Sequence, residues 1–325
     1  MVAIGSKIDE VRVDGRLEQV RMDLKAYKKI GLKAAEIPVH GVDAIKNGRV
    51  DKRQTNKIVD LLRRFDFKYS VHAPNPLNLM DRESPRLHAD VFRASLTFAE
   101  EIGAKILVYH PGRFLVEEEF PINMPLLYTE EEKQQLLDEE AFTIEQLARD
   151  FKGITICMEN ARPYLVHSPY CYAEQIGLLR DQVLRIGRSN VKITLDIGHL
   201  YMASKFYGFD PVEAAKSIAG LIAHTHVHDN FGGAIYHHQK TQTHQLPFGR
   251  GDSHMPVGWG NAPIRDILAT YVDGYGGMYM MELRNRYFDH TEESRDNLEC
   301  IMTTIYRKPK KGKIVVKEGA ACSST

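Results

Sequence analysis

The chain has 325 residues, of which 43% are hydrophobic and 26% are charged, as is ordinary for a globular protein in water. Lys and Arg together number 43, and so do Asp and Glu, so no excess of positive charge points to nucleic acid as a partner. No apolar run approaches the roughly 20 residues of a membrane span, and the first residues lack a secretion signal. We therefore expect a soluble, cytoplasmic protein that has no membrane partner.

Eight apolar segments of β type alternate with segments of helical periodicity. The apolar segments are 2–9, 32–40, 67–75, 105–112, 154–163, 191–199, 222–230 and 278–286. The helical segments are 16–29, 51–65, 85–102, 130–151, 172–187, 211–220, 263–272 and 291–306. This alternation favours parallel strands joined by right-handed helical crossovers, and strands that are apolar almost throughout are buried on both faces.

The alternation predicts an α/β fold, a (β/α)8 TIM barrel, as a single domain over residues 1–306. A doubly wound open sheet is the competing fold, but it would place a glycine-rich phosphate turn after the first strand, where this chain has GSKID. Two connections are unusually long, 113–129 after the fourth strand and 231–262 after the seventh, and such loops are commonly lids or binding loops. Residues 307–325 are basic and poor in apolar residues, and we expect a flexible or docking tail there.

Residues that can bind a metal or move a proton stand at the carboxyl ends of these strands. They are His72, His110, Glu159, Asp196, His199, His226, His228 and Glu282. In a (β/α)8 barrel these ends all face one mouth, where the active site lies. The pattern therefore predicts a metalloenzyme.

Four of these residues form an expected inner set: Glu159, Asp196, His226 and Glu282. Each ends an apolar strand, and burying a carboxylate there is costly unless it is paired or bound to a metal. Carboxylate and imidazole ligands together suit Mn, Mg, Co or Zn, and we expect one divalent ion, with Mn as the first choice. The alternative is an internal hydrogen-bonded network without a metal.

A second, outer set is expected to bind the substrate: His72, His110, His199, Asp252, His254 and Arg284. His72 and His110 each precede a proline turn, and the segment GDSHMPVGWG brings Asp252 and His254 back toward the mouth. Arg284, like Arg113, Arg162 and Arg286, follows a strand end and could hold an anionic group. In HVHDN, His226 is the expected ligand, whereas His228 and Asp229 are expected at the rim.

The motifs HAP, HPG, MEN, LDIGH, HVHDN, GDSHMPVGWG and MEL resemble those of the xylose-isomerase-like TIM-barrel superfamily over roughly residues 1–300. That group contains sugar and sugar-phosphate isomerases and epimerases, and more distantly the abasic-site DNA endonucleases. The resemblance to the epimerase branch implies one metal bound by the inner set. It also implies that Glu159 and Glu282 act as the acid and base, and that His199 contacts a substrate hydroxyl.

The endonuclease branch implies a different use of the same residues. Its three-zinc site would fall on His72, His110, Glu159, Asp196, His199, His226, Asp252, His254 and Glu282. The surrounding motifs depart from that branch, because DIGH replaces a D-T-C-H type sequence and GDSHMPVGWG replaces a D-R-H type loop. Some ketohexose epimerases carry an arginine where this chain has Gly232, so a specific ketohexose 3-epimerase is not predicted.

The predicted function is a metal-dependent isomerase or epimerase that moves a proton of a sugar or sugar derivative through an enediolate. A lyase, deglycosylating or dehydratase enzyme that uses the same enolate is one alternative. A multi-zinc abasic-site endonuclease is another, although nucleic acid is the less favoured partner. The third alternative is a non-catalytic sugar-binding barrel or a subunit that works with a partner, and assembly as a homo-oligomer is left open.

Overall fold

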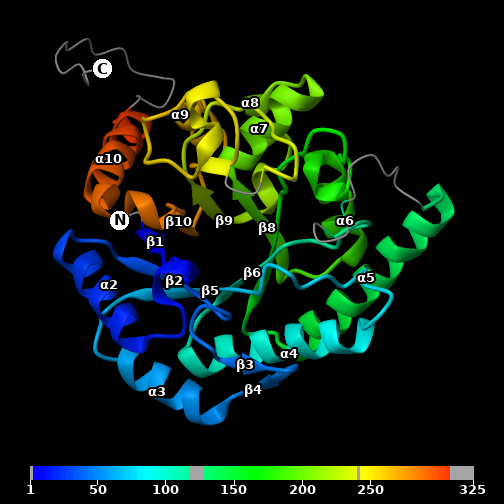
Figure 1. Ribbon diagram of the computed structural model, residues 1–325, viewed down its shortest axis with the longest axis horizontal. Helices are drawn as coiled ribbons and strands as arrows, with labels where there is room; N and C mark the ends of the chain where they lie inside the picture. The colour runs from blue at the N-terminus through cyan, green and yellow to red at the C-terminus, as the bar shows by residue number, and fades with distance from the viewer. Residues whose placement is uncertain (1–2, 117–119, 121–127, 240–241, 308–325) are drawn as a thin grey trace.

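Eight parallel strands close into a barrel, as the sequence predicts. The computed structural model describes residues 3–116, 120, 128–239 and 242–307. Around the barrel the strands run β1 (Ala3–Lys7), β2 (Ala34–Pro38), β5 (Lys68–His72), β6 (Ile106–Tyr109), β7 (Thr155–Glu159), β8 (Val191–Asp196), β9 (Ile222–Val227) and β10 (Met278–Met281). Strand β10 pairs with β1 and completes the ring, which Figure 1 shows end-on.

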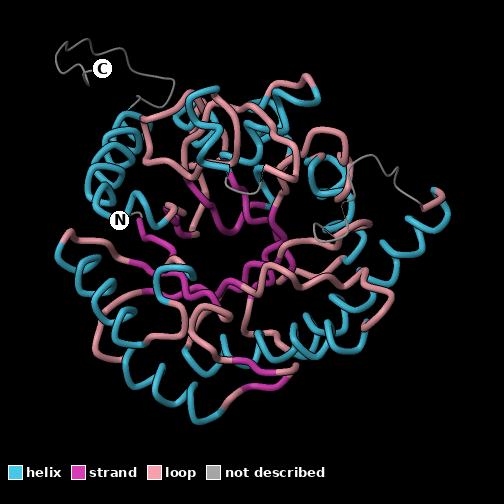
Figure 2. The backbone as a smooth tube through the Cα atoms, in the orientation of Figure 1, coloured by secondary structure: helices cyan, strands magenta, loops and turns pink. Residues whose placement is uncertain are grey.

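Helices surround the strands, as the tube in Figure 2 shows. They are α1 (Glu10–Val13), α2 (Leu17–Lys29), α3 (Lys52–Leu62), α4 (Pro85–Ile102), α5 (Glu130–Asp150), α6 (Ile176–Ile186), α7 (Ile197–Tyr207), α8 (Pro211–Ser217), α9 (Ile264–Leu268) and α10 (Thr291–Arg307). A two-stranded hairpin, β3 (Ile45–Lys46) and β4 (Arg49–Val50), lies outside the barrel. In the described residues no helix is both long and apolar enough to cross a membrane.

Helix α7 is the main difference from the predicted elements. The sequence predicts a β segment over 191–199 and the next helix only at 211–220, but β8 ends at Asp196 and α7 begins directly after it. The Asp196 carboxylate caps it by accepting a hydrogen bond from the His199 backbone N–H at 2.7 Å. Most of this helix is buried, so its sequence lacks the polar face that marks an amphipathic helix.

The interior of the barrel is layered, because alternate residues of each strand point inward. At the amino ends of the strands, Ala3, Ala34, Met278 and Met280 pack together with Ile106 from the opposite side of the barrel. A polar layer containing Glu36, Ser70 and His224 follows, with all three side chains fully buried. The strand ends that the sequence singles out lie two residues further along, at the mouth.

The two long connections are present, and the structure describes them in part. Residues 117–119 and 121–127 of the first lie outside the described residues, as does the predicted tail beyond Arg307. The second connection contains a 3-10 segment, Gln242–Phe248, and then returns to the mouth. There the backbones of Asp229 and Met255 exchange hydrogen bonds of 2.9 and 3.0 Å, which fix the loop that carries Asp252 and His254.

Candidate metal centre and substrate pocket

The predicted inner set converges at the mouth. One ligand atom from each of Glu159, Asp196, His226 and Glu282 lies within 4.8 Å of the others. His226 is central: its Nδ1 is 3.1 Å from Glu159 Oε1, 3.1 Å from Glu282 Oε2 and 4.0 Å from Asp196 Oδ2. All four residues are at most 9% exposed.

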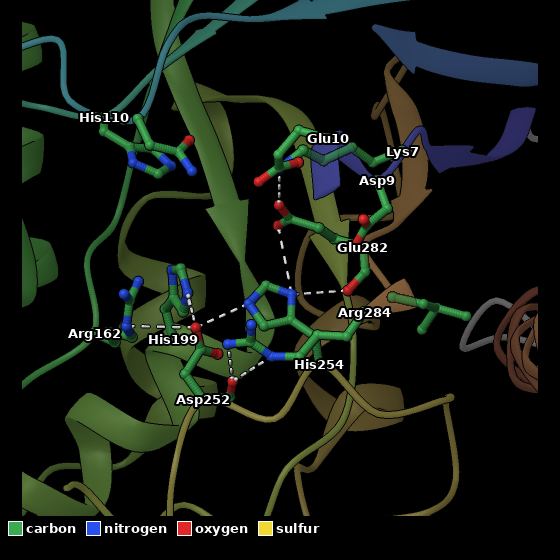
Figure 3. A pocket seen from close by; sticks show the side chains of 12 residues that line it. Lys7, Asp9, Glu10, His110, Arg162, His199, Asp252, His254, Glu282 and Arg284 are labelled. Atoms are coloured by element: carbon green, nitrogen blue, oxygen red, sulfur yellow. Dashed lines mark hydrogen bonds and ion pairs between the residues drawn. The ribbon is translucent and has the colours of Figure 1, made fainter. Parts of the chain in front are cut away.

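The outer residues form two further donor clusters beside the inner set. His72 and His110 reach Glu159 Oε2 through their Nε2 atoms, at 3.7 and 3.2 Å. On the other side, Asp252 Oδ2 lies 3.4 Å from His199 Nε2 and 2.9 Å from His254 Nε2. Figure 3 shows His199, Asp252 and His254 gathered together, with His110 across the pocket.

Three of these histidines have a ring orientation that suits a metal ligand. The Nδ1 atoms of His72, His199 and His254 lie 2.7, 3.0 and 2.8 Å from backbone carbonyl oxygens of Ala73, Asn160 and Glu282. A carbonyl oxygen can only accept, so each Nδ1 carries the ring hydrogen and a neutral ring offers its Nε2 lone pair. Metal-binding histidines are commonly held in this way.

The Nε2 lone pairs face carboxylate oxygens, which is unfavourable unless a proton or a cation lies between them. Burial lowers the pKa of His254, so its ring is neutral, yet Nε2 lies 2.9 Å from Asp252 Oδ2. Neighbouring ligands bound at about 2.0–2.2 Å to one tetrahedral or octahedral ion lie roughly 2.8–3.6 Å apart. The separations of these donors therefore fit a shared cation.

The charges of the site support the same conclusion. Five buried carboxylates gather at the site: Glu36, Glu159, Asp196, Asp252 and Glu282. Two permanently charged cations lie against them, Lys7 beside Glu282 and Arg162 beside Asp252. Three negative charges are left, which only histidine protons or metal ions can offset. The residues present therefore fit a divalent ion.

Without an ion, protons take its place on some of the rings. Burial disfavours the charged form of His226, but Glu159, Glu36 and Glu282 outweigh burial and hold its pKa well above the usual value. Burial also opposes charge on His199, where Asp196 and Asp252 raise the pKa to about 10. At His110 the effect of burial exceeds the opposing effect of the Glu159 charge and lowers the pKa to about 4, so this ring is neutral.

The mouth holds two adjoining pockets, of about 150 and 90 Å³. Both are lined by Asn75, His110, Arg162 and His199. The larger also includes Asp252, His254, Glu282 and Arg284, and the smaller includes Glu159. His72 was expected to bind substrate, but it is 1% exposed and lines neither pocket, so it lies behind Glu159.

The arginines near the mouth already bind protein atoms. Arg284 Nη2 donates to the backbone oxygen of Asp252 at 2.7 Å, and Arg162 Nε lies 3.4 Å from the Asp252 carboxylate. Arg113 Nη2 donates to the backbone oxygens of Asn75 and Leu77, at 2.9 and 3.4 Å. Arg284 and Arg162 therefore hold the loop that carries Asp252, while both still line the pocket.

The family described as xylose isomerase-like TIM barrel matches residues 24–304 of this chain. The chain belongs to this family. Among curated proteins, none matches it.

Solved structures that resemble this xylose isomerase-like barrel include several sugar epimerases. A D-tagatose 3-epimerase-like protein is 20% identical, with a TM-score of 0.68 over 94% of this chain and 99% of its own. An L-ribulose 3-epimerase is 13% identical, with a TM-score of 0.67 over 97% and 100%. A 3-keto-D-glucoside 4-epimerase from E. coli is 16% identical, with a TM-score of 0.64 over 93% and 100%. At these identities the likeness establishes the fold.

Lys7 belongs to the site of this xylose isomerase-like barrel, although the sequence analysis does not predict it. Lys7 ends β1 and is 7% exposed, with its Nζ 2.5 Å from Glu282 Oε1 and 3.5 Å from Glu10 Oε2. Burial opposes its charge, but Glu10 and Glu282 outweigh burial and raise its pKa. Figure 3 shows Lys7, Glu10 and Glu282 on one side of the pocket. A single charged residue at the end of an apolar run was the signal available in the sequence.

Replacing Lys7 with Met is expected to destabilise the metal-free protein by about 3 kcal/mol, because Glu282 loses its buried partner. Loading the protein with a divalent ion should recover part of this loss, since the ion supplies positive charge to Glu282. Urea unfolding with and without metal measures both effects. An unfolding free energy equal to that of the wild type would contradict this role.

The predicted rim position of His228 and Asp229 is wrong. His228 is fully buried, with its Nε2 3.1 Å from Asp196 Oδ1. Asp229 is 2% exposed and accepts hydrogen bonds from the backbone N–H groups of Gly258 and Ala262. The returning loop covers both residues, which the strand pattern alone does not reveal.

Gly198 makes room for His228, because a Cβ at Gly198 would overlap the His228 ring. Gly198→Ala is therefore expected to cost about 1–3 kcal/mol of stability by overpacking and to displace His228 from Asp196. Gly177→Ala is a matched control, since Gly177 also lies in a helix and a Cβ added there would meet nothing within 4 Å. The control should be neutral or stabilising by up to about 1 kcal/mol. Equal melting temperatures for the two variants would refute the steric role.

Proposed function

We propose that this barrel is a divalent-metal-dependent isomerase or epimerase that acts on a sugar or sugar derivative. The observation that carries the proposal is the convergence of Glu159, Asp196, His226 and Glu282 beside the two pockets. Two carboxylates beside the pockets, each with an oxygen 3.1 Å from His226 Nδ1, suit the removal and return of a proton. The sugar epimerases among the structural neighbours support this choice of substrate class.

Each residue has a defined task in the proposed reaction. The inner set would hold the ion, which we expect to be Mn²⁺ before Mg²⁺, Co²⁺ or Zn²⁺, and which when bound polarises a carbonyl and stabilises an enediolate. Glu159 and Glu282 flank His226 and each lines one of the two adjoining pockets; one would remove the proton beside the carbonyl and the other would return it. His199 and Arg162 line both pockets and would hold substrate oxygens.

Solvent exchange tests the proposal directly. The metal-loaded protein, incubated in D₂O with a panel of ketoses, aldoses and oxo-glycosides, should place deuterium on the carbon next to the carbonyl. Product analysis then separates isomerisation or epimerisation from elimination, because a lyase or dehydratase loses a group after the same proton is removed. Tight sugar binding without exchange or turnover would instead indicate a non-catalytic barrel or a subunit that needs a partner.

One observation favours a second candidate, a multi-zinc abasic-site endonuclease. Donors gather in three places along the mouth: Glu159 with His72 and His110, the inner set around His226, and Asp252 with His199, His228 and His254. Zinc content and cleavage of an abasic-site duplex test it. Three zinc ions per chain with cleavage would support the endonuclease, whereas one ion and no cleavage would support the isomerase. The neutral overall charge of the chain argues against a DNA partner.

A further inference from the structure

A fully buried carboxylate, that of Glu36, lies directly beneath the inner set. Its Oε2 accepts a hydrogen bond from Ser70 Oγ at 2.8 Å and lies 3.0 Å from His224 Nε2. Its other oxygen, Oε1, lies 3.0 Å from His226 Nε2. Glu36 is 0% exposed and lines neither pocket at the mouth, so it has no direct path to a substrate.

His226 therefore stands between two sets of carboxylates. Its Nε2 faces Glu36, and its Nδ1 faces Glu159 and Glu282. With an ion bound at the inner set, the imidazole is neutral and has one ring hydrogen. A hydrogen on Nε2, which the charge of Glu36 favours, leaves the Nδ1 lone pair directed at the inner set.

We propose that Glu36 is a positioning residue that fixes the tautomer and orientation of His226, and so prepares Nδ1 to bind the divalent ion. This inference rests on the metal dependence in the proposed function. Carboxylates that orient a metal-binding histidine typically change metal affinity by 10- to 100-fold when they are removed. The ligand concerned is a divalent cation at the inner set, and Glu36 acts on it only through His226.

The main competing role is that Glu36 itself binds an ion. One donor atom each from Glu36, His72 and His226 lies within 4.8 Å of the others. However, all three residues are at most 1% exposed, and one oxygen of Glu36 is already engaged by Ser70 and His224. Oε1 of Glu36 and Nε2 of His226 lie 3.0 Å apart as an ion pair, and neither atom has a hydrogen-bond partner in the described residues, so this contact is one of charge.

Glu36→Gln tests the inference, because the amide keeps the shape of the carboxylate but is neutral and brings hydrogens of its own. The apoprotein is titrated with Mn²⁺ and with Zn²⁺ by calorimetry and by chelator competition. We expect affinity to fall by roughly 10- to 100-fold while the number of bound ions stays the same. Asp23→Asn is the matched control, since Asp23 is also a buried carboxylate but is paired with Arg12 on the outside of the barrel. It should leave metal affinity unchanged.

Unchanged affinity in folded Glu36→Gln, or the loss of one whole ion, would overturn the positioning role. If this variant does not fold, long-range ¹H–¹⁵N spectra of the zinc-loaded wild type give the answer without it. They should show His226 protonated at Nε2, with Nδ1 bound to the ion, and the opposite tautomer would overturn the inference. If the wild type binds no divalent ion, the proposed function itself fails, which is a different result from a bound ion that is insensitive to Glu36.

Discussion

Glu159→Gln is expected to lower turnover by roughly 10³-fold or more while the barrel stays folded. Glu159 has contacts with two donor clusters, because Oε1 lies 3.1 Å from His226 Nδ1 and Oε2 lies 3.2 Å from His110 Nε2. The amide keeps the volume of the side chain, so no cavity forms in the mouth. It cannot accept a proton, however, and it is a weaker metal ligand. Steady-state kinetics and circular dichroism of the metal-loaded variant measure the two effects separately.

Two comparisons make this prediction specific. Deuterium exchange at the substrate carbon should disappear together with turnover, because the proton-transfer step itself is lost. Asp23→Asn, which neutralises a buried carboxylate outside the site, should keep wild-type turnover. Near-full activity of Glu159→Gln at saturating metal would contradict the assigned role.

Metal removal is expected to abolish turnover and to lower the melting temperature by roughly 4–8 °C. An ion present at about 1,000 times its dissociation constant stabilises the native state by about 4 kcal/mol, and each kcal/mol shifts the melting temperature of a chain of this size by roughly 1–2 °C. The physical cause is the excess of buried carboxylates, which the histidine protons only partly replace. Thermal melts of chelator-treated and reloaded protein, with elemental analysis, provide the measurement.

Asp196→Asn is the variant that links this shift to the inner set. Asp196 is fully buried, and its carboxylate both caps α7 and lies 3.1 Å from His228 Nε2. An asparagine still caps a helix well, so the fold should remain. The difference in melting temperature between the metal-loaded and metal-free forms should shrink. A difference as large as that of the wild type would show that the ion binds elsewhere.

Local sequence patterns predicted the architecture, because the barrel repeats one simple unit. Apolar strands bounded by amphipathic helices require burial on both faces of a parallel sheet, and the inward side of each strand follows from its two-residue period. Glu159, Asp196, His226 and Glu282 could be named for this reason. Helix α7 was not predicted, because a buried helix has no polar face and so its sequence lacks the 3.6-residue hydrophobic period.

The sequence by itself thus determined the fold class and the residues that stand at the mouth of the barrel. Only the tertiary structure decided how they interact, because their partners lie far apart along the chain. Lys7 and Glu282 are 275 residues apart, and Glu36 and His224 are 188 apart. The burial of His228, the ring orientation of His254 and the position of Glu36 beneath His226 depend on barrel closure and on the returning loop. Strand periodicity sets which side chains point inward, but only closure of the ring sets which of their atoms meet.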